Sequence, residues 1–422
     1  MNLAFTRYVL GTTNGKRNTI GEAARLAKCE LVDNKSDLTP NKLQYTLRGD
    51  PALTLAAPTQ QIVIDEIDGQ PVTDGETLQL AAGSVAKVTG HIVSGEDIDD
   101  SFDGVISATI RDAEETIVCK LNDTSEADNP FTFKDRTKTL YNGSDSVRSG
   151  VFTLTFAVPK DISYTDNPGL MTLYAVDYNK VREAHGENES VIFNGSIITK
   201  KDSIGPSIYC YLNSKSFTNG GKVHTTPYFV AELYDDDGIN ASGSSIGHDL
   251  ELIIDGDMSK TYNLNSYFSY EFGDYRNGTI GFSIPKLDYG KHKLLFRAWD
   301  VLNNSSTAEL DFEVVKGLEP NCLDVTCKHN STTDGISFVI THDRAGCEIN
   351  VQLDIYDMSG RQLWRYKESG VPSDDTYTLD WNLGIDGGRH LPTGVYLFRV
   401  SISSDGSSQS SKAKKIIITG NN

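Results

Sequence analysis

The spacing of apolar and polar residues changes near residue 59. Before that point, Thr19-Ile20-Gly21-Glu22 has the pattern of a capping box, in which the Thr19 hydroxyl accepts from a helical N–H and Glu22 reaches back. The apolar positions that follow predict a short helix through Lys28, and residues 43–47 then alternate and predict a strand. This is the pattern of an α/β edge, and residues 1–58 are too few to bury a core of their own.

From residue 59 onward, short alternating segments are separated by Gly, Asn, Asp and Pro. Residues 151–156 place three apolar side chains on one face and threonines on the other, and residues 349–355 and 396–400 alternate in the same way. Many short strands with turn residues between them predict a mainly β chain built from tandem immunoglobulin-like β-sandwiches.

Three β units are expected after the first segment, at residues 59–201, 202–317 and 318–422. The second begins where Gly205-Pro206 interrupts the pattern, and the third begins near Pro320. An internal echo supports this division, because residues 173–177 and 295–300 both carry Ala-x-Asp near the end of a proposed unit. Late strands of related sandwiches are expected to share such a pattern.

The net charge of −19 over 422 residues argues against a nucleic-acid partner, because an acidic surface repels phosphates. No stretch approaches the roughly 20 apolar residues that a membrane helix needs, so we expect no transmembrane segment. Residues 1–7 lack the pattern of a signal peptide. We therefore expect either an internal protein or a natural N-terminus upstream, and the rest of the sequence favours the second.

The six cysteines are scattered, which argues against a disulfide scaffold. Cys322 and Cys327 are close enough in sequence to suggest a pair, with Cys347 as a competing partner. No CxxC pair and no histidine at zinc-finger spacing occurs, so these cysteines are not expected to hold a metal. The sequence has no GxSxG motif and no histidine in a strand-to-helix elbow, which are patterns that indicate a nucleophile with its base. No catalytic residue is therefore assigned.

Two features remain as candidate binding sites. Asp235 and Asp237, in an Asp-Asp-Asp-Gly-Ile-Asn turn, can supply oxygen ligands for calcium, although no other cofactor is expected. The alternative is an ordinary acidic turn, with Gly238 at positive φ and Asn240 bonded to its own backbone. The aromatic residues in 263–270, with Tyr275, either bind glycan or protein or fill a sandwich core.

Three groups of stretches carry a resemblance to a known family. The stretches are Gly21-Glu22-Ala23 through Gly49-Asp50-Pro51-Ala52-Leu53; residues 235–240, 247–249, Leu264-Asn265-Ser266-Tyr267-Phe268 and 298–304; and Tyr356-Asp357-Met358-Ser359-Gly360, Trp381-Asn382 and Gly394-Val395-Tyr396. They resemble, in turn, the closing segment of the gingipain-type cysteine peptidase domain, the region after that domain in the type IX secretion sortases of Bacteroidetes, and the immunoglobulin-like C-terminal domains that serve as sorting signals. Together they resemble the gingipain-type cysteine peptidase family, and within it the type IX secretion sortases.

The resemblance implies that residues 1–58 are the C-terminal remnant of a caspase-like peptidase domain. The family's sortase cleaves cargo C-terminal domains through a cysteine with a histidine partner, at the outer face of the outer membrane, and attaches cargo to the surface. No residue here matches that pair, so enzymatic activity of this chain is left open and the chain is expected to be inactive alone. Cys29 is expected to be structural.

The implied partners are the proteins of the type IX attachment complex, including an outer-membrane barrel shuttle, and the C-terminal domains of cargo. The β units would then position the peptidase and dock these partners at the cell surface. The alternative is a stand-alone adhesion or binding protein built from tandem β-sandwiches.

Overall fold

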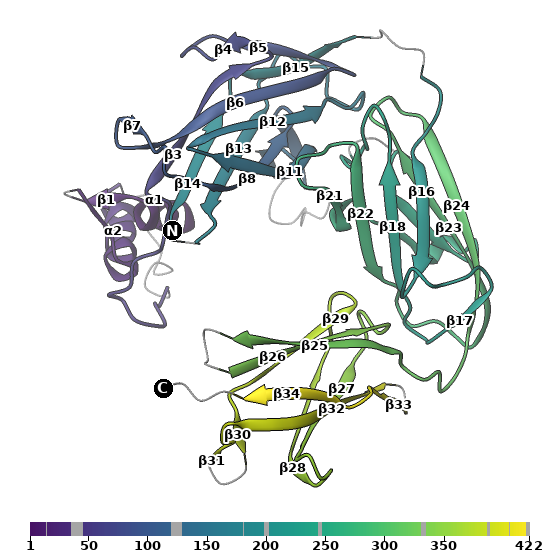
Figure 1. The fold of residues 1–422 in the computed structure, drawn as a ribbon. Helices are drawn as coiled ribbons and strands as arrows, with labels where there is room; N and C mark the ends of the chain where they lie inside the picture. The colour runs from purple at the N-terminus through teal and green to yellow at the C-terminus, as the bar shows by residue number, and fades with distance from the viewer. Residues whose placement is uncertain are drawn as a thin grey trace.

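The computed structural model describes residues 1–13, 15–34, 45–119, 129–179, 181–197, 202–243, 247–330, 335–385, 389–404 and 406–418. Within these residues the chain is mainly β, as predicted, with two α-helices at its start, α1 (Asn2–Leu10) and α2 (Ile20–Asp33). Three β units follow one another along an open curve that leads from the two helices to the C-terminal unit (Figure 1). No helix among these residues is long and apolar enough to cross a bilayer.

The start of α2 confirms half of the predicted capping box. The Thr19 hydroxyl accepts from the Glu22 backbone N–H at 3.2 Å. The other half is wrong, because the Glu22 carboxylate pairs with Arg25 at 2.6 Å instead of reaching back. The helix runs to Asp33, beyond the predicted end at Lys28. Of the predicted strand at 43–47, the first two residues lie outside the described part and the other three form no strand.

The missing strand has a physical reason. A strand needs a hydrogen-bonding neighbour, and in this segment the structure describes only the short hairpin of β1 (Thr12–Thr13) and β2 (Lys16–Arg17). The Tyr45 carbonyl instead accepts from the Lys28 ammonium at 2.7 Å. The Gly-Asp-Pro-Ala-Leu stretch packs on the start of α2, where a Cβ on Gly21 would lie 2.7 Å from the Pro51 Cβ.

The first β unit closes on itself. Its strands are β3 (Gln60–Ile67), β4 (Gln70–Pro71), β5 (Leu78–Ala82), β6 (Val85–Ser94), β7 (Asp97–Ile98), β8 (Gly104–Arg111), β9 (Glu115–Val118), β10 (Thr132–Asp135), β11 (Thr139–Arg148), β12 (Val151–Ala157), β13 (Leu170–Asp177), β14 (Glu183–Asn188) and β15 (Val191–Ser196). In the sheet order β4-β3-β14-β13-β8-β11-β12-β6-β7, strand β3 pairs with both β14 and β6. The predicted strand at 151–156 is β12, and its three apolar side chains are buried inside the closed sheet.

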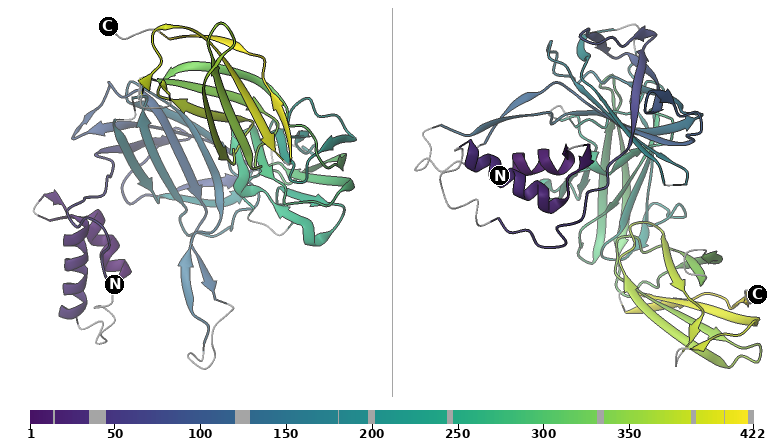
Figure 2. Two further views of the ribbon diagram at one scale, coloured as in Figure 1. Left: turned by 90° about the horizontal axis from the view of Figure 1, so that it is seen from below. Right: turned by 90° about the vertical axis from the view of Figure 1, so that its left-hand side faces the viewer.

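Closure depends on a glycine at the seam. Gly90 in β6 faces Ile64 in β3, and a Cβ at this position would lie 2.2 Å from the Val63 carbonyl oxygen and 2.6 Å from the Phe152 ring. Only a residue without a side chain lets the two backbones approach this closely. Figure 2 shows the β9–β10 hairpin projecting away from this unit.

The second unit is a sandwich of two sheets. Its elements are β16 (Ser207–Leu212), β17 (Gly221–Val223), β18 (Tyr228–Tyr234), β19 (Glu251–Ile254), η1 (Met258–Lys260), β20 (Thr261–Asn263), η2 (Asn265–Tyr267), β21 (Phe268–Tyr270), β22 (Asn277–Ser283), β23 (Gly290–Trp299) and β24 (Ser305–Val314). The four-stranded sheet β16-β18-β22-β21 faces the five-stranded sheet β17-β24-β23-β19-β20. Fully buried Phe229 and Phe296 meet between the sheets with ring centroids 5.2 Å apart.

The third unit is a smaller sandwich. Its strands are β25 (Cys322–Asn330), β26 (Gly335–His342), β27 (Ile349–Tyr356), β28 (Gln362–Gly370), β29 (Thr376–Trp381), β30 (Gly384–Ile385), β31 (Arg389–His390), β32 (Gly394–Ser404), β33 (Ser407–Ser410) and β34 (Lys414–Ile418). The sheet β25-β26-β29 packs on the sheet β28-β27-β32-β33, in which β34 also pairs with β32. The predicted strands at 349–355 and 396–400 are confirmed as parts of β27 and β32.

The suggested disulfide among three late cysteines is wrong, since all six cysteines are free. Cys322 and Cys327 belong to one strand, β25, where they pair with His342 and Phe338 of β26. Residues five apart in a strand are separated by roughly 16 Å, which is too far for a disulfide. Cys347 lies elsewhere, buried against the second unit.

Candidate functional site at the domain junctions

The acidic turn after β18 is held by its own backbone. The Asp235 carboxylate accepts from the N–H groups of Asp237 at 2.9 Å and Gly238 at 3.3 Å. Gly238 has φ of 115°, and the Asn240 side chain accepts from the Ser242 N–H at 3.1 Å, as the alternative of an ordinary acidic turn predicts. Among the described residues no group of three or more His, Cys, Asp or Glu is arranged to hold a metal ion.

This turn nevertheless carries unusual electrostatics. Burial, together with the nearby Asp300 carboxylate, raises the pKa of Asp235 to about 6. Burial also raises the pKa of Asp300, which is fully buried. A second charge of the same sign in a region of low dielectric favours the neutral form of each carboxyl.

The first and second units meet around a buried carboxylate, Asp161. Its oxygens accept from the side-chain amides of Asn240 and Asn303, each at 2.9 Å, and from a ring nitrogen of His248, also at 2.9 Å. All three donors come from loops of the second unit, and Asp161 is only 6% exposed. Nearby, the Lys160 N–H donates to the Val301 carbonyl at 2.8 Å. Because a buried charge is costly unless it is bonded, this contact fixes how the two units meet.

The second and third units meet around a histidine and a cysteine. The Cys347 sulfur lies 3.4 Å from Nδ1 of His224, 3.1 Å from the Thr226 hydroxyl and 3.3 Å from the Thr226 carbonyl. Both His224 and Cys347 are buried, with 3% and 7% exposed. The preceding residue, Gly346, packs so closely that a Cβ would lie 1.7 Å from the Ser283 hydroxyl.

A cysteine beside a histidine invites comparison with a catalytic pair, but the environment of this pair opposes that role. Burial and, secondarily, the Arg344 guanidinium lower the pKa of His224 to about 3, so the ring is neutral at pH 7 and is a weak base. The sulfur is enclosed between two domains, whereas a nucleophilic thiolate needs access to its substrate and a favourable charge nearby. The pair therefore acts as packing at the junction.

A groove of about 730 Å³ runs beside this junction, over the outer face of the sheet β16-β18-β22-β21. We call it the tyrosine groove, after Tyr211, Tyr228 and Tyr267, which line it together with Asp374 and Asp375 of the third unit. The two aspartates stand in the loop between β28 and β29, so the groove is shared by two units. Domain interfaces are common places for ligand sites.

The aromatic residues of segment 263–270 lie partly against the core of the second unit and partly at the tyrosine groove. Phe268 and Tyr270 pack against the core of the second unit, and the Tyr270 hydroxyl donates to the Ile239 carbonyl at 2.7 Å. Tyr270 also touches Tyr141 of the first unit, with ring centroids 4.9 Å apart. Tyr267 instead stays 48% exposed at the tyrosine groove. The core-filling alternative therefore holds for Phe268 and Tyr270, and in part for Tyr267, whose ring meets Phe282 edge to face with centroids 5.0 Å apart.

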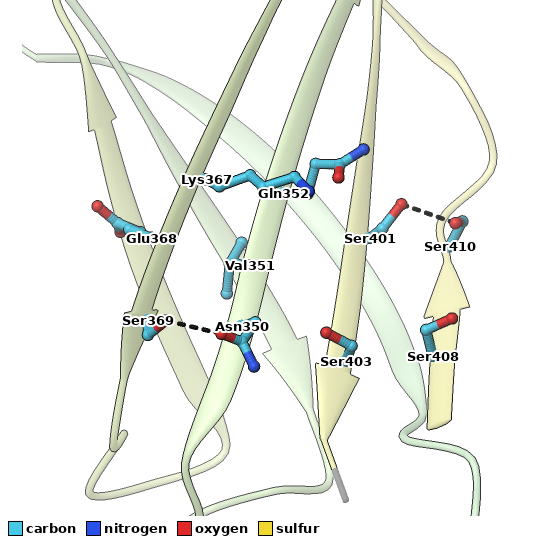
Figure 3. A pocket seen from close by; sticks show the side chains of 10 residues that line it. All are labelled: Asn350, Val351, Gln352, Lys367, Glu368, Ser369, Ser401, Ser403, Ser408 and Ser410. Atoms are coloured by element: carbon cyan, nitrogen blue, oxygen red, sulfur yellow. Dashed lines mark hydrogen bonds between the residues drawn. The ribbon is translucent and has the colours of Figure 1, made fainter. Parts of the chain in front are cut away.

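The outer face of the sheet β28-β27-β32-β33 is polar. Figure 3 shows its hydroxyl and amide side chains in rows across the strands, with Ser369 donating to Asn350 and Ser401 bonded to Ser410, both at 2.7 Å. Farther along β27, the buried Asp354 carboxylate accepts from Arg365 at 2.6 Å. These bonded pairs satisfy part of the polar surface on this exposed sheet face.

Neither junction can be anticipated from the sequence. His224 and Cys347 are 123 positions apart, and Asp161 is 142 positions from Asn303. His224, Cys347 and Asp161 belong to no motif noted above, whereas Asn240, His248 and Asn303 lie in stretches that carry the family resemblance. The contacts themselves arise only where two units touch. A single weak signal exists for the tyrosine groove, since Tyr267 belongs to the aromatic segment noted above.

The comparisons with known proteins give one informative similarity. No family model matches the chain, and no curated protein matches it. Among solved structures, dimeric latent PorU from Porphyromonas gingivalis is 31% identical over 98% of this chain, with a TM-score of 0.44. The chain spans 39% of the length of that protein. Over nearly its whole length, the chain is thus similar to part of PorU.

Other similar structures are β-domain proteins of low identity. The first three fibronectin domains of chicken CNTN1 are 11% identical over 86% of this chain and 99% of theirs, with a TM-score of 0.19. A bacterial ice-binding adhesin is 14% identical over 86% of this chain and 98% of its own, with a TM-score of 0.18. These values carry no functional inference.

Proposed function

We propose that this chain is the non-catalytic region of a PorU-like type IX secretion sortase, in which the β units support a gingipain-type peptidase domain and dock partner proteins at the cell surface. The observation that carries the proposal is the 31% identity to PorU over 98% of the chain. Because the chain spans only 39% of PorU, cleavage of cargo and its attachment to the surface are proposed for the complete sortase.

The geometry of the junctions supports a scaffold role. Asp161 and the pair of His224 with Cys347 are buried contacts between successive units, so the units are held in a defined arrangement. Relative motion of domains is expected unless their interface is well packed. A scaffold that presents several partners to one another benefits from such fixed spacing.

Docking is tested with the purified full chain as bait. We expect it to retain proteins of the type IX attachment complex from the same organism, including the outer-membrane barrel shuttle, or to bind cargo C-terminal domains. The control is the Asp161→Ala chain, which keeps the folded units but loses the first junction. Retention of none of these partners, together with binding to host-cell surface material, would favour the alternative of a stand-alone adhesion protein.

Activity is tested separately by incubating the chain with a cargo protein that carries its C-terminal sorting domain. We expect no cleavage by the chain alone. The control variant replaces Cys347, the cysteine that lies beside a histidine, with alanine. Cleavage by the natural chain that disappears in this variant would overturn the assignment of a non-catalytic region.

Calcium at Asp235 and Asp237 remains a separate proposal, supported by the nearby Asp300 and Asp237 carboxylates, which add to burial in raising the pKa of Asp235. A bound cation would favour their charged forms. We expect calcium, but not magnesium at equal concentration, to raise the unfolding temperature of the chain. No change with calcium, or an equal change in the Asp235→Asn variant, would remove the proposal.

A further inference from the structure

One position on the floor of the tyrosine groove lacks a side chain. On the outer face of the second unit, Tyr211 pairs with Val230, and Val230 pairs with Gly281. Phe268 pairs with Ile280, and Tyr267, which precedes Phe268 at the end of η2, lines the groove together with Gly281. The lining therefore combines the buried Tyr211 with valine and glycine, and it leaves Tyr267 exposed.

Tyr228 covers the floor of the groove at Gly281. An ideal Cβ on Gly281 would lie 2.1 Å from the Tyr228 hydroxyl, so the ring leans over the glycine. The backbone of Tyr228 is itself fixed, because its N–H donates to the Asn213 side chain at 2.9 Å and its carbonyl accepts from the Asn213 N–H at 2.7 Å. This wall of the groove is thus preformed, which lowers the entropic cost of binding.

The charge of the groove is negative on the side of the third unit. Asp374 and Asp375 are exposed, and neither forms an ion pair with a cation in the part of the chain that the structure describes. Their field reaches the rings opposite: burial and then these two carboxylates raise the pKa of Tyr228. The one lysine of the lining, Lys215, is already paired with Glu232 at 2.6 Å.

The tyrosine rings and the two aspartates of the groove together favour one class of ligand. A tyrosine ring attracts a cation over its face, and a nearby unpaired carboxylate adds a direct ionic contact. A flat sugar ring would need a broad exposed aromatic face, whereas Tyr211 is only 9% exposed and Tyr267 alone presents much of its ring. A side chain with a cationic end matches an exposed tyrosine ring together with two acids on the side of the third unit.

We propose that the tyrosine groove binds an arginine- or lysine-bearing segment of a partner polypeptide. The cationic side chain lies against the exposed ring of Tyr267, and its charged end reaches the aspartates of the third unit. Because the groove is shared by two units, binding depends on the junction that His224 and Cys347 form. The proposal does not depend on the similarity to PorU, and its failure would leave that similarity unchanged.

The test measures fluorescence anisotropy of a short labelled peptide of alternating arginine and serine, titrated with the full chain. A peptide of alternating glutamate and serine is the probe control. We expect the arginine peptide to bind and the glutamate peptide not to bind. Replacing both aspartates, Asp374→Asn with Asp375→Asn, should weaken binding by about tenfold, and added salt should weaken it further.

Further variants distinguish binding of the peptide at the tyrosine groove from its general attraction to an acidic chain. Tyr267→Ala should weaken binding by about three- to tenfold, while Tyr267→Phe keeps the ring and should bind as the natural chain does. The matched charge control is Asp74→Asn with Glu76→Gln, which removes two exposed acids from a turn of the first unit. It should leave binding unchanged.

Two results would overturn the proposal. One is equal weakening by the control pair at positions 74 and 76, which would mean that peptide binding follows net charge alone. The other is competition by a neutral glucose oligosaccharide that is lost in Tyr267→Ala, which would make the groove a glycan site. All variants change exposed side chains, and their unfolding temperatures are measured to verify that they fold.

Discussion

At the scale of single residues, the most informative positions are those where a small or neutral group is required at a contact between units. Gly346 adopts φ of 69° and lies against Ser283 of the second unit. His224 is buried in its neutral form beside Cys347. Both requirements come from the second unit approaching the third, and each leads to a measurable consequence.

Gly346→Ala should destabilise the junction more than its backbone conformation alone explains. Left-handed backbone costs a non-glycine residue about 1–2 kcal/mol, and the collision with Ser283 should add about 1–3 kcal/mol. The matched control is Gly360→Ala, which has φ of 86° and open space around the new methyl group. Urea unfolding of both variants gives the comparison. Equal losses of unfolding free energy would contradict the proposed contact.

The free energy of unfolding of the chain should fall as the pH falls below 6.5, the pKa of an ordinary histidine. The pKa of His224 is about 3 in the folded chain and 6.5 in the unfolded chain, so the unfolded state binds more protons between these values. Its contribution is fully present above pH 6.5 and is lost as the pH falls toward 3. Unfolding free energy measured across this window should vary less in His224→Gln.

The titration of Asp235 changes the unfolding free energy in the opposite direction over part of this pH range. Its raised pKa of about 6 means that its contribution is present below about pH 4 and is lost as the pH rises through 6. The natural chain therefore reports the sum of both groups, and only the difference between it and His224→Gln isolates the histidine. An identical pH dependence in the two proteins would show that His224 is not buried at a closed junction.

At the scale of elements, the repeated Ala-x-Asp pattern has a structural meaning. Asp177 ends β13 and accepts from the N–H groups of Val181 and Arg182 at 2.9 and 3.3 Å. Asp300 follows β23 and accepts from the N–H groups of Leu302 and Asn304 at 2.9 and 2.7 Å. In both units a buried aspartate satisfies the backbone of the turn that leads into the next strand. The sequence echo thus reflects a buried aspartate with the same role at the end of a late strand in two units, although the backbone groups that it binds differ.

The closed sheet of the first unit makes its own prediction at this scale. Gly90→Ala should cost about 1–3 kcal/mol or more, because the new methyl group would meet the Val63 carbonyl at the seam between β3 and β6. Hydrogen exchange should become faster in β3 before it does in β13. The control is Gly69→Ala, at the turn that ends β3, where φ of 73° costs about 1–2 kcal/mol but nothing lies within 4 Å, so this variant is strained without a collision at the seam. Unchanged exchange in β3 of the Gly90 variant would contradict closure.

At the scale of the whole molecule, the arrangement of the first two units depends on Asp161. Asp161→Ala removes the acceptor of two amides and one imidazole, and leaving buried donors unpaired should cost about 2–4 kcal/mol. Small-angle scattering should show a wider distribution of distances between units. The control, Asp166→Ala, removes an exposed acceptor of the Asn194 amide and should leave the profile unchanged. An unaltered profile in Asp161→Ala would mean that other contacts fix the junction.

The sequence alone determined the elements whose signals are local. Alternation placed β12, β27 and β32 correctly, because a strand with one buried face must repeat every second residue. The Thr19 cap and the Gly238 turn followed from the chemistry of single side chains. The mainly β fold class therefore follows from short segments of sequence, without knowledge of which strands pair or pack against them.

Only the tertiary structure decided which strands close a sheet and which side chains meet between units. The β3–β6 seam and the contacts of Asp161, of Cys347 and of Tyr267 join residues far apart in the chain. Residues 45–47, the described part of the strand expected at residues 43–47, form no strand for the complementary reason, since a strand forms only beside a partner. Packing between distant segments leaves no local pattern, so these features emerge only when the chain is folded.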